Sequence, residues 1–205
     1  MTQPAQRGDA GPVGLRERKK QKTRQSIQEH ALRLFGEQGY DRTTIEQIAE
    51  AAEVSPSTYF RYFPTKEDVV LYDALDPMLI ESFRRQPADL TPTEALRGSL
   101  HEVLGALTPE QVREQNERGR LIFAVPDLQA TWVAELMRTA GVLTSLLAER
   151  LGRDPGDFNI RVYTGAVMGA LMAAVLPAAD SSGVDFVAVL DAALDLLEAG
   201  LRIDS

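Results

Sequence analysis

Residues 43–66 read Thr-Thr-Ile-Glu-Gln-Ile-Ala-Glu-Ala-Ala-Glu-Val-Ser-Pro-Ser-Thr-Tyr-Phe-Arg-Tyr-Phe-Pro-Thr-Lys, and this stretch decides the fold. Thr43 or Thr44 can cap a first short helix, in which apolar residues recur at helical spacing. Ser55 can cap a second helix, with Pro56 at the first position, where a missing N–H does no harm. Two short helices joined by a tight turn predict a helix-turn-helix module, whose second helix enters the DNA major groove.

This stretch resembles the TetR family of bacterial transcriptional regulators. The resemblance rests on Ile48–Ala52 and Val54–Glu67, and it covers roughly residues 16–72. It implies an all-α fold, in which an N-terminal three-helix helix-turn-helix DNA-binding domain precedes a C-terminal helical domain for ligand binding and dimerisation. The helical pattern of the whole chain predicts about nine helices.

Two residues depart from the family pattern. Glu53 stands at the turn, where the family usually has glycine, so a positive φ there would strain the backbone. Phe60 replaces a tyrosine that contacts phosphate in many members, and its ring could pack on a thymine methyl group instead. Tyr59 is then expected in the core, and Tyr62 becomes the better phosphate donor.

The resemblance and the side-chain chemistry together predict the DNA contacts. The contacting residues are expected to be Thr44, Ser55, Pro56, Ser57, Thr58, Phe60, Tyr62 and Lys66. Ser57 and Thr58 are candidates for base edges, whereas the resemblance implies phosphate contacts for Thr44, Tyr62 and Lys66.

The charge of the chain is unevenly distributed. Its formal net charge is −8, yet residues 1–66 hold more basic than acidic side chains. A dense basic run occupies Arg16, Arg18, Lys19, Lys20, Lys22 and Arg24. Such a run can neutralise phosphates, although a solvated tail is the alternative.

The sequence predicts three segments: a disordered arm at 1–15, the helix-turn-helix domain at 16–64 and the ligand-binding and dimerisation domain at 65–205. The first helix is expected from about Arg18 to Gln38, and one continuous helix is expected from Thr65 past Leu79. Cysteine is absent, and the N-terminus lacks the apolar region of a signal peptide. A cytoplasmic protein is therefore expected, associated with the nucleoid when bound to DNA.

The resemblance implies that the last two helices form the dimer interface, because TetR-like proteins dimerise through their last two long helices. Residues 162–179 carry no charge, but Pro177 and the many Ala and Gly residues favour a buried helix over a membrane span. Small residues and a leucine seam are the interface candidates: Gly165, Gly169, Leu190, Leu194, Leu197 and Leu201. For any single residue among these, an ordinary intrachain core is the alternative.

Apolar, aromatic and a few polar side chains are candidates for an effector pocket. These candidates are Met78, Phe83, Leu100, His101, Leu104, Phe123, Trp132, Met137 and Tyr163. Trp132 is the strongest, because its amphipathic ring suits an apolar pocket with one polar contact. Plain core packing is the alternative for each, and a surface position for His101.

Enzymatic patterns are lacking. The two histidines, His30 and His101, are far apart in sequence, and no glycine-rich phosphate loop or nucleophile elbow is present. The sequence predicts no enzyme, no cofactor and no metal site. It predicts a homodimeric regulator, most simply a repressor, that a small apolar effector such as an acyl thioester releases from a palindromic operator in double-stranded DNA. Two alternatives remain: a transcriptional activator, or a small-molecule carrier whose helix-turn-helix domain (the reader) is vestigial.

Overall fold

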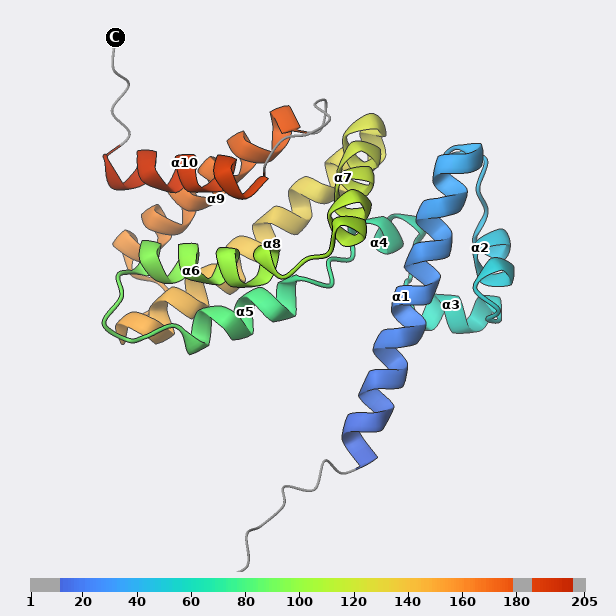
Figure 1. The fold of residues 1–205 in the computed structure, drawn as a ribbon, viewed down its shortest axis with the longest axis horizontal. Coiled ribbons are helices and arrows are strands. Elements are labelled where there is room, and N and C mark those ends of the chain that lie inside the picture. The colour runs from blue at the N-terminus through green and yellow to red at the C-terminus, as the bar shows by residue number, and fades with distance from the viewer. Residues whose placement is uncertain (1–11, 179–185, 201–205) are drawn as a thin grey trace, which may run out of the picture. The chain divides into compact units, whose positions relative to one another are not determined.

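The computed structural model describes residues 12–178 and 186–200 of the 205-residue chain. Within these ranges all regular structure is helical (Figure 1). The helices are α1 Pro12–Gln38, α2 Ile45–Ala51, α3 Pro56–Tyr62, α4 Lys66–Leu71, α5 Asp76–Arg85, α6 Pro92–Gly105, α7 Pro109–Ala124, α8 Pro126–Leu151, α9 Phe158–Ala178 and α10 Phe186–Glu198. The predicted all-α class is confirmed, with one helix more among the described residues than the nine expected.

The chain forms two compact units, which divide directly after Val70. The prediction ends the first domain at Pro64, but the structure places most of α4 in the first unit. Gln28 of α1 donates from its Nε2 to the carbonyl oxygen of Val69 at 2.9 Å, and Val69 and Val70 are both fully buried. These contacts make α4 part of the core of the first unit.

The core of the first unit draws apolar side chains from all of its helices. Its buried members include Ile27, Ala31, Phe35, Ile48, Ala49, Tyr59, Phe63, Val69 and Val70. Their regular spacing along α1 and α2 places one face of each helix inward, as expected for amphipathic helices. The opposite faces of α2 and α3 are left on the surface.

The first helix begins earlier than expected. It starts at Pro12, not near Arg18, so the end of the segment predicted to be disordered is helical. Side chains 14–22 are all exposed, so intrinsic helix propensity accounts for the extension. Proline fits a first helical turn, and Arg, Lys, Gln and Glu are good helix formers. The N-terminal turns of α1 extend beyond α3 (Figure 1). Residues 1–11 lie outside the described residues.

The single helix expected from Thr65 past Leu79 is two helices, and that prediction is wrong. The helix α4 ends at Leu71, and α5 begins at Asp76. Pro77, in the first turn of α5, explains the break, because a proline inside a continuous helix removes a hydrogen bond and clashes with the preceding turn.

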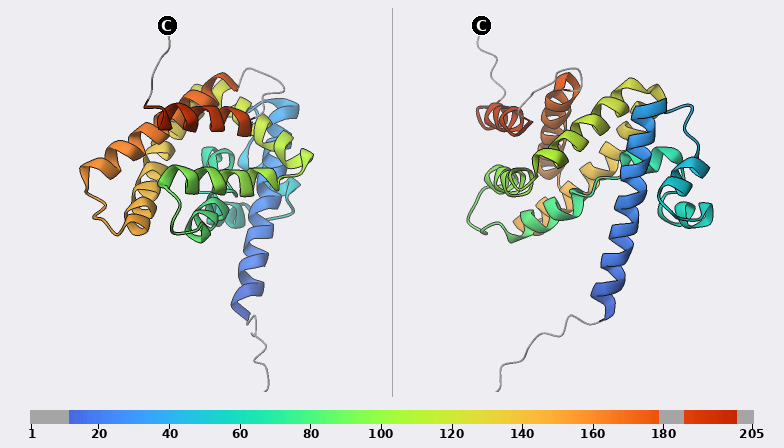
Figure 2. Two further views of the ribbon diagram at one scale, coloured as in Figure 1. Left: turned by 60° about the vertical axis from the view of Figure 1, so that its left-hand side comes forward. Right: turned by 45° about the vertical axis from the view of Figure 1, so that its right-hand side comes forward.

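Two apolar clusters hold the second unit together. The larger joins α5, α6, α8 and α9 through residues such as Phe83, Ala95, Leu147 and Val167. The smaller packs Leu100 of α6 against α10, which lies against α6 and α9 (Figure 2). Among the described residues, none of the helices has both the length and the hydrophobicity that crossing a membrane would require.

Candidate nucleic-acid interface and effector unit

The start of α2 is fixed by a reciprocal pair of side-chain hydrogen bonds. The Thr44 hydroxyl accepts from the backbone N–H of Gln47 at 3.2 Å, and the Gln47 side chain accepts from the backbone N–H of Thr44 at 2.9 Å. This capping box satisfies two N–H groups that the helix itself leaves unpaired. Thr44 is exposed, whereas Thr43 is buried and donates to the Gly39 carbonyl at 2.8 Å.

The turn between α2 and α3 contains the strained residue that the sequence indicates. Glu53 has φ 54°, in the left-handed region, and it is the non-glycine residue with positive φ in the described chain. The condition for backbone strain at this position, a positive φ, is therefore met. A side chain in this conformation brings Cβ close to the backbone, which glycine would avoid.

Three hydroxyl groups meet at the start of α3. Ser55 is the N-cap, and its Oγ accepts from the backbone N–H of Thr58 at 3.1 Å. The same Oγ lies 2.9 Å from both the Ser57 Oγ and the Thr58 Oγ1. Pro56 occupies the first turn, as expected. Ser57 is exposed and Thr58 is half-buried, so short polar side chains line the exposed start of this helix.

The aromatic residues of α3 face in different directions. Tyr59 is fully buried, as predicted, and its hydroxyl donates to the Thr65 carbonyl at 3.2 Å. Burial raises the pKa of Tyr59 far above its usual range, and the nearby carboxylates act in the same direction. Phe60, by contrast, is 48% exposed, so its ring is available on the surface of α3. Tyr62 is half-buried, with the Arg24 and Arg61 guanidinium groups over its ring.

Lys66 has a structural task that the sequence does not indicate. Its Nζ donates to the carbonyl oxygens of Tyr40 at 2.9 Å and Thr43 at 3.3 Å, and it lies 4.1 Å from the centre of the Tyr40 ring. The Tyr40 hydroxyl in turn donates to Glu67 at 2.8 Å. The start of α4 is thus fastened to the loop between α1 and α2. Because an ammonium group has three N–H donors, a phosphate contact by Lys66 would use the remaining one.

The pocket candidates of the second unit lie in different surroundings. Phe83 and Leu100 are buried in separate apolar clusters, with Tyr163 packed against the first and Leu104 against the second. The remaining candidates are a ring pair and exposed side chains: Phe123 with Trp132 at 5.1 Å between ring centres, then Met78, Met137 and His101.

Hydroxyl and imidazole groups among these candidates are already bonded. The Tyr163 hydroxyl pairs with the Thr93 hydroxyl at 2.8 Å, linking α9 to α6. His101 lies 2.7 Å from Asp191 of α10, as expected of a surface histidine. The neighbouring Arg97 bonds to the same carboxylate at 2.9 Å, so polar contacts fasten α10 to α6.

An arginine of α7 holds the segment that leaves α4. Arg118 donates from Nη1 to the carbonyl oxygen of Tyr72 at 2.9 Å and from Nη2 to Asp73 Oδ2 at 2.5 Å. Asp73 also accepts from the backbone N–H of Leu75 at 2.9 Å. Next to this group, burial and the Asp73 carboxylate raise the pKa of Asp76 to about 6, although nearby arginines act in the opposite direction. Sequence reasoning missed this cluster, because its members are distant in sequence.

The leucine seam of α10 is turned into the subunit. Leu190 and Leu194 are 2% and 1% exposed, and both pack against Leu100 of α6. Leu197 packs against both apolar clusters, and Leu201 lies outside the described residues. Leu190 and Leu194 therefore pack as intrachain core, the alternative that the sequence leaves open for each of these residues. A dimer interface on other residues of the last two helices stays a prediction.

A different apolar stripe is exposed on α9. Phe158 and Val162 are 70% and 53% exposed, and Gly165, Gly169 and Met172 continue the stripe at alternating spacings of four and three residues. This spacing places all five on one face of the helix. The two glycines singled out in the sequence thus lie on the surface of the subunit.

Two family models match the chain. The model of bacterial regulatory proteins of the tetR family matches residues 27–72, which include α2, α3 and α4. The model of the MftR C-terminal domain matches residues 90–202, more than half of the chain.

Individual relatives agree with these matches. The HTH-type transcriptional regulator TcmR of Streptomyces glaucescens is 36% identical over 166 residues, which are 75% of this chain and 71% of TcmR. An HTH-type transcriptional repressor of Mycobacterium tuberculosis is 27% identical over 187 residues, which are 87% of this chain and 92% of that protein. The structure resembles FadR of Thermus thermophilus, a TetR-family repressor in complex with lauroyl-CoA, with a TM-score of 0.56 and 28% identity over 89% of this chain and 96% of FadR. The chain therefore belongs to the TetR family of DNA-binding transcriptional regulators.

Proposed function

We propose that the protein is a homodimeric repressor that an acyl-CoA thioester releases from a palindromic operator. The exposed start of α3 carries this proposal. Its short hydroxyl side chains and the exposed Phe60 ring form a surface that suits the edges of base pairs and a thymine methyl group. A solvent-exposed phenylalanine in this place has little use in a carrier protein.

The DNA contacts follow from the position of each side chain. Ser57 and Thr58 read base edges, and Phe60 packs on a thymine methyl group. Thr44 and Tyr62 bind phosphates on either side of α3, and Lys66 adds a positive charge while it holds the α1–α2 loop. Two copies of α3 then enter successive major grooves about 34–36 Å apart on one face of a palindrome.

The exposed stripe of α9 is the proposed dimer interface. Its two glycines allow close approach of a second α9, and Phe158, Val162 and Met172 supply apolar area around them. The spacing by four and three residues supports a helix-to-helix contact along the length of the stripe. A twofold dimer of this kind matches the twofold symmetry of a palindromic operator.

The class of effector rests on similarity and on composition. The FadR relative binds lauroyl-CoA, and it shares 28% of its residues with this chain over nearly its whole length. The second unit contains two apolar clusters, with Trp132 and Phe123 as a partly buried ring pair outside them. An acyl chain would enter by separating such apolar side chains, and the effector acts only if it binds that opened state more tightly.

Arg118 provides a route by which the effector reaches α4. It joins α7 to Tyr72 and Asp73, which directly follow the last residue of α4. A shift of α7 would pull on these bonds and move the end of α4. We propose that this movement changes the separation of the two recognition helices in the dimer, so that they no longer match successive grooves.

The test is selection of preferred sequences from a random duplex pool at about 0.15 M salt, where non-specific binding is weak. A palindromic consensus, released by lauroyl-CoA and retained with CoA alone, is the expected result. CoA is the matched control because it lacks only the acyl chain. A protein stripped of bound lipid that enriches no sequence would refute DNA recognition, and equal release by both compounds would refute an acyl effector.

A further inference from the structure

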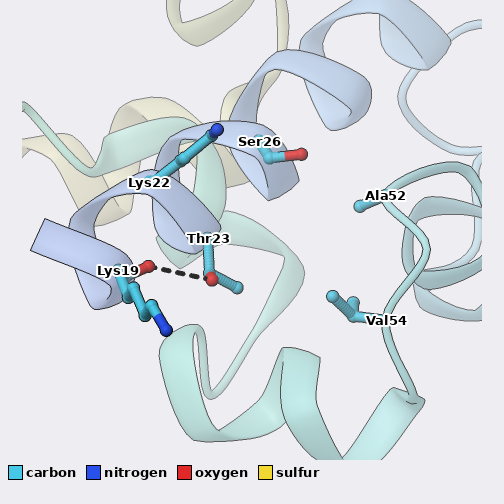
Figure 3. Close-up of a pocket in the computed structure, with 6 residues that line it drawn as sticks. All are labelled: Lys19, Lys22, Thr23, Ser26, Ala52 and Val54. Atoms are coloured by element: carbon cyan, nitrogen blue, oxygen red, sulfur yellow. Dashed lines mark hydrogen bonds between the residues drawn. The ribbon is translucent and has the colours of Figure 1, made fainter. Parts of the chain in front are cut away.

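A hollow of about 330 Å³ lies in the first unit between α1 and the turn that joins α2 to α3 (Figure 3). One side is lined by Lys19, Lys22, Thr23 and Ser26 of α1, and the other by Ala52 and Val54 of the turn. The proposed base and phosphate contacts use none of these residues. The hollow therefore lies in the DNA-binding unit, but none of the proposed DNA contacts involves it.

The α1 side of the hollow is one polar and basic helix face. Its four residues follow one another at intervals of three, one and three, which places them on the same side of a helix. In Figure 3 the Lys19 and Lys22 ammonium groups extend on either side of Thr23. The Thr23 hydroxyl donates to the Lys19 carbonyl at 3.0 Å, so its oxygen still offers lone pairs and its proton is occupied. Positive charge from the two lysines therefore dominates this side.

The turn side of the hollow adjoins the recognition helix. Val54 immediately precedes Ser55, the N-cap of α3. An α-helix with its side chains nearly fills a major groove about 12 Å wide, so the elements beside it must lie next to the sugar-phosphate backbone. A duplex that accepts α3 thus brings a phosphate strand towards the end of α3 where the hollow opens.

Beyond the hollow, α1 continues as a charged rod. Arg16, Arg18 and Lys20 are exposed on the turns that extend past α3, and Glu17 is the acidic residue among them. From Lys19 to Pro12 the axis rises by roughly 10 Å. A sugar-phosphate backbone that passes the hollow would continue along the exposed basic residues of α1. This arrangement favours a polymer of phosphates, and not a single small anion, as the ligand.

We propose that the hollow binds a backbone phosphate of duplex DNA, with Lys19 and Lys22 neutralising its charge. This site rests on the proposed DNA recognition, and it adds a contact that is independent of base sequence. Glu53 in the adjoining turn carries an exposed carboxylate, which opposes an anion in the hollow. The site therefore binds DNA with lysines on one side and a repelling charge on the other.

The test compares the wild type with the double variant Lys19→Gln and Lys22→Gln, by fluorescence anisotropy between about 0.1 and 0.3 M salt. Both the selected operator and a scrambled duplex are used. Loss of one phosphate contact from each of the two subunits of the proposed dimer should reduce the slope of log K against log salt by roughly 1.8 and weaken both duplexes about ten-fold alike. The variant Glu53→Gln should tighten binding to both duplexes.

The control is the double variant Arg113→Gln and Arg120→Gln, which removes the same charge from exposed positions of α7. Its slope should match that of the wild type. An unchanged slope in the lysine variant overturns the site, and so does a loss confined to one duplex. Stabilisation of the wild type but not the lysine variant by inorganic phosphate, with equal salt slopes on DNA, would assign the hollow to a free anion and overturn a DNA contact. Because the scrambled duplex reports on phosphates alone, a failure of operator selection leaves this test readable.

Discussion

The short helices of the DNA-binding unit and the last two helices of the second unit differ in how far nearby residues determine their structure. In the reader, Thr44 and Ser55 cap α2 and α3 through bonds to residues three positions away. In the second unit, α9 and α10 are both rich in apolar residues, and packing against α6 decides that α10 turns its leucines inward. Local bonds can be identified in a sequence, whereas the choice between two apolar faces depends on partners that are distant in the chain.

The largest expected effect lies on α10. The substitution Leu194→Ala should lower the free energy of unfolding by about 3 kcal/mol, because it leaves a cavity beside Leu100 and Leu190. Urea denaturation measures this loss. The matched control is Leu196→Ala, on the exposed side of the same helix, which should change stability by less than about 0.5 kcal/mol. Equal losses at the two positions would contradict the inward orientation of the seam.

The next prediction concerns the exposed face of α9. Apart from its chain neighbours and the nearby backbone of α9 itself, no described atom lies within 4 Å of the place where a Cβ at Gly165 would stand, so Gly165→Leu should leave the isolated subunit folded. The added side chain would separate two copies of α9 and yield monomers, which light scattering measures. Gly141→Leu on α8 is the matched control, because that position is equally open within the described structure. A dimer that survives Gly165→Leu but not Gly141→Leu would move the interface to α8.

The difference between the two units also explains what the sequence could predict. The caps at Thr44, Ser55, Thr91 and Thr108 were all predictable, because each cap and its partner lie within four residues. The positive φ of Glu53 could be considered only through the family pattern, in which glycine usually occupies this turn position.

Tertiary contacts account for most of what the sequence did not predict. The Arg118 contacts to Tyr72 and Asp73 join residues more than forty positions apart, and so no pattern indicates them. The break before α5 could have been predicted from Pro77, which the expected helix would have had to include. The buried and exposed faces of α9 and α10 could not have been predicted, because both helices carry apolar residues on several sides.

The capping threonines Thr44 and Thr108 should contribute alike to stability, but only Thr44 should contribute to DNA binding. Thr44→Ala removes the cap of α2 and should lower the free energy of unfolding by about 1 kcal/mol. Thr108→Ala removes an identical capping box from α7 and should lower it by a similar amount. Only Thr44→Ala should also weaken DNA binding, because only that hydroxyl is proposed to contact a phosphate. Equal DNA affinities of the two variants would remove Thr44 from the interface.

The raised pKa of Asp76 predicts a pH dependence of stability. Because the folded protein binds this proton more tightly than the unfolded chain, the contribution of Asp76 is most favourable below about pH 4 and falls as the pH rises to about 6. Asp76→Asn should therefore gain up to about 1 kcal/mol at pH 7, after allowance for partial exposure to solvent, and nothing near pH 4. The control is Asp127→Asn in the first turn of α8, an exposed position. A gain at pH 7 that persists at pH 4 would contradict this origin.

The smallest expected effect concerns the turn between α2 and α3, where the cause is the local backbone conformation of Glu53. Glu53→Gly relieves the left-handed backbone, which is worth roughly 1–2 kcal/mol, and the greater freedom of glycine in the unfolded chain offsets about half of this gain. We expect a net stabilisation of about 0.5 kcal/mol in urea denaturation. Glu53→Ala is the matched control, because it removes the carboxylate but keeps a Cβ at φ 54°. If alanine stabilised the protein as much as glycine, the charge of the carboxylate and not backbone strain would be the cause, and the turn would depend on electrostatic interactions with the surrounding charges.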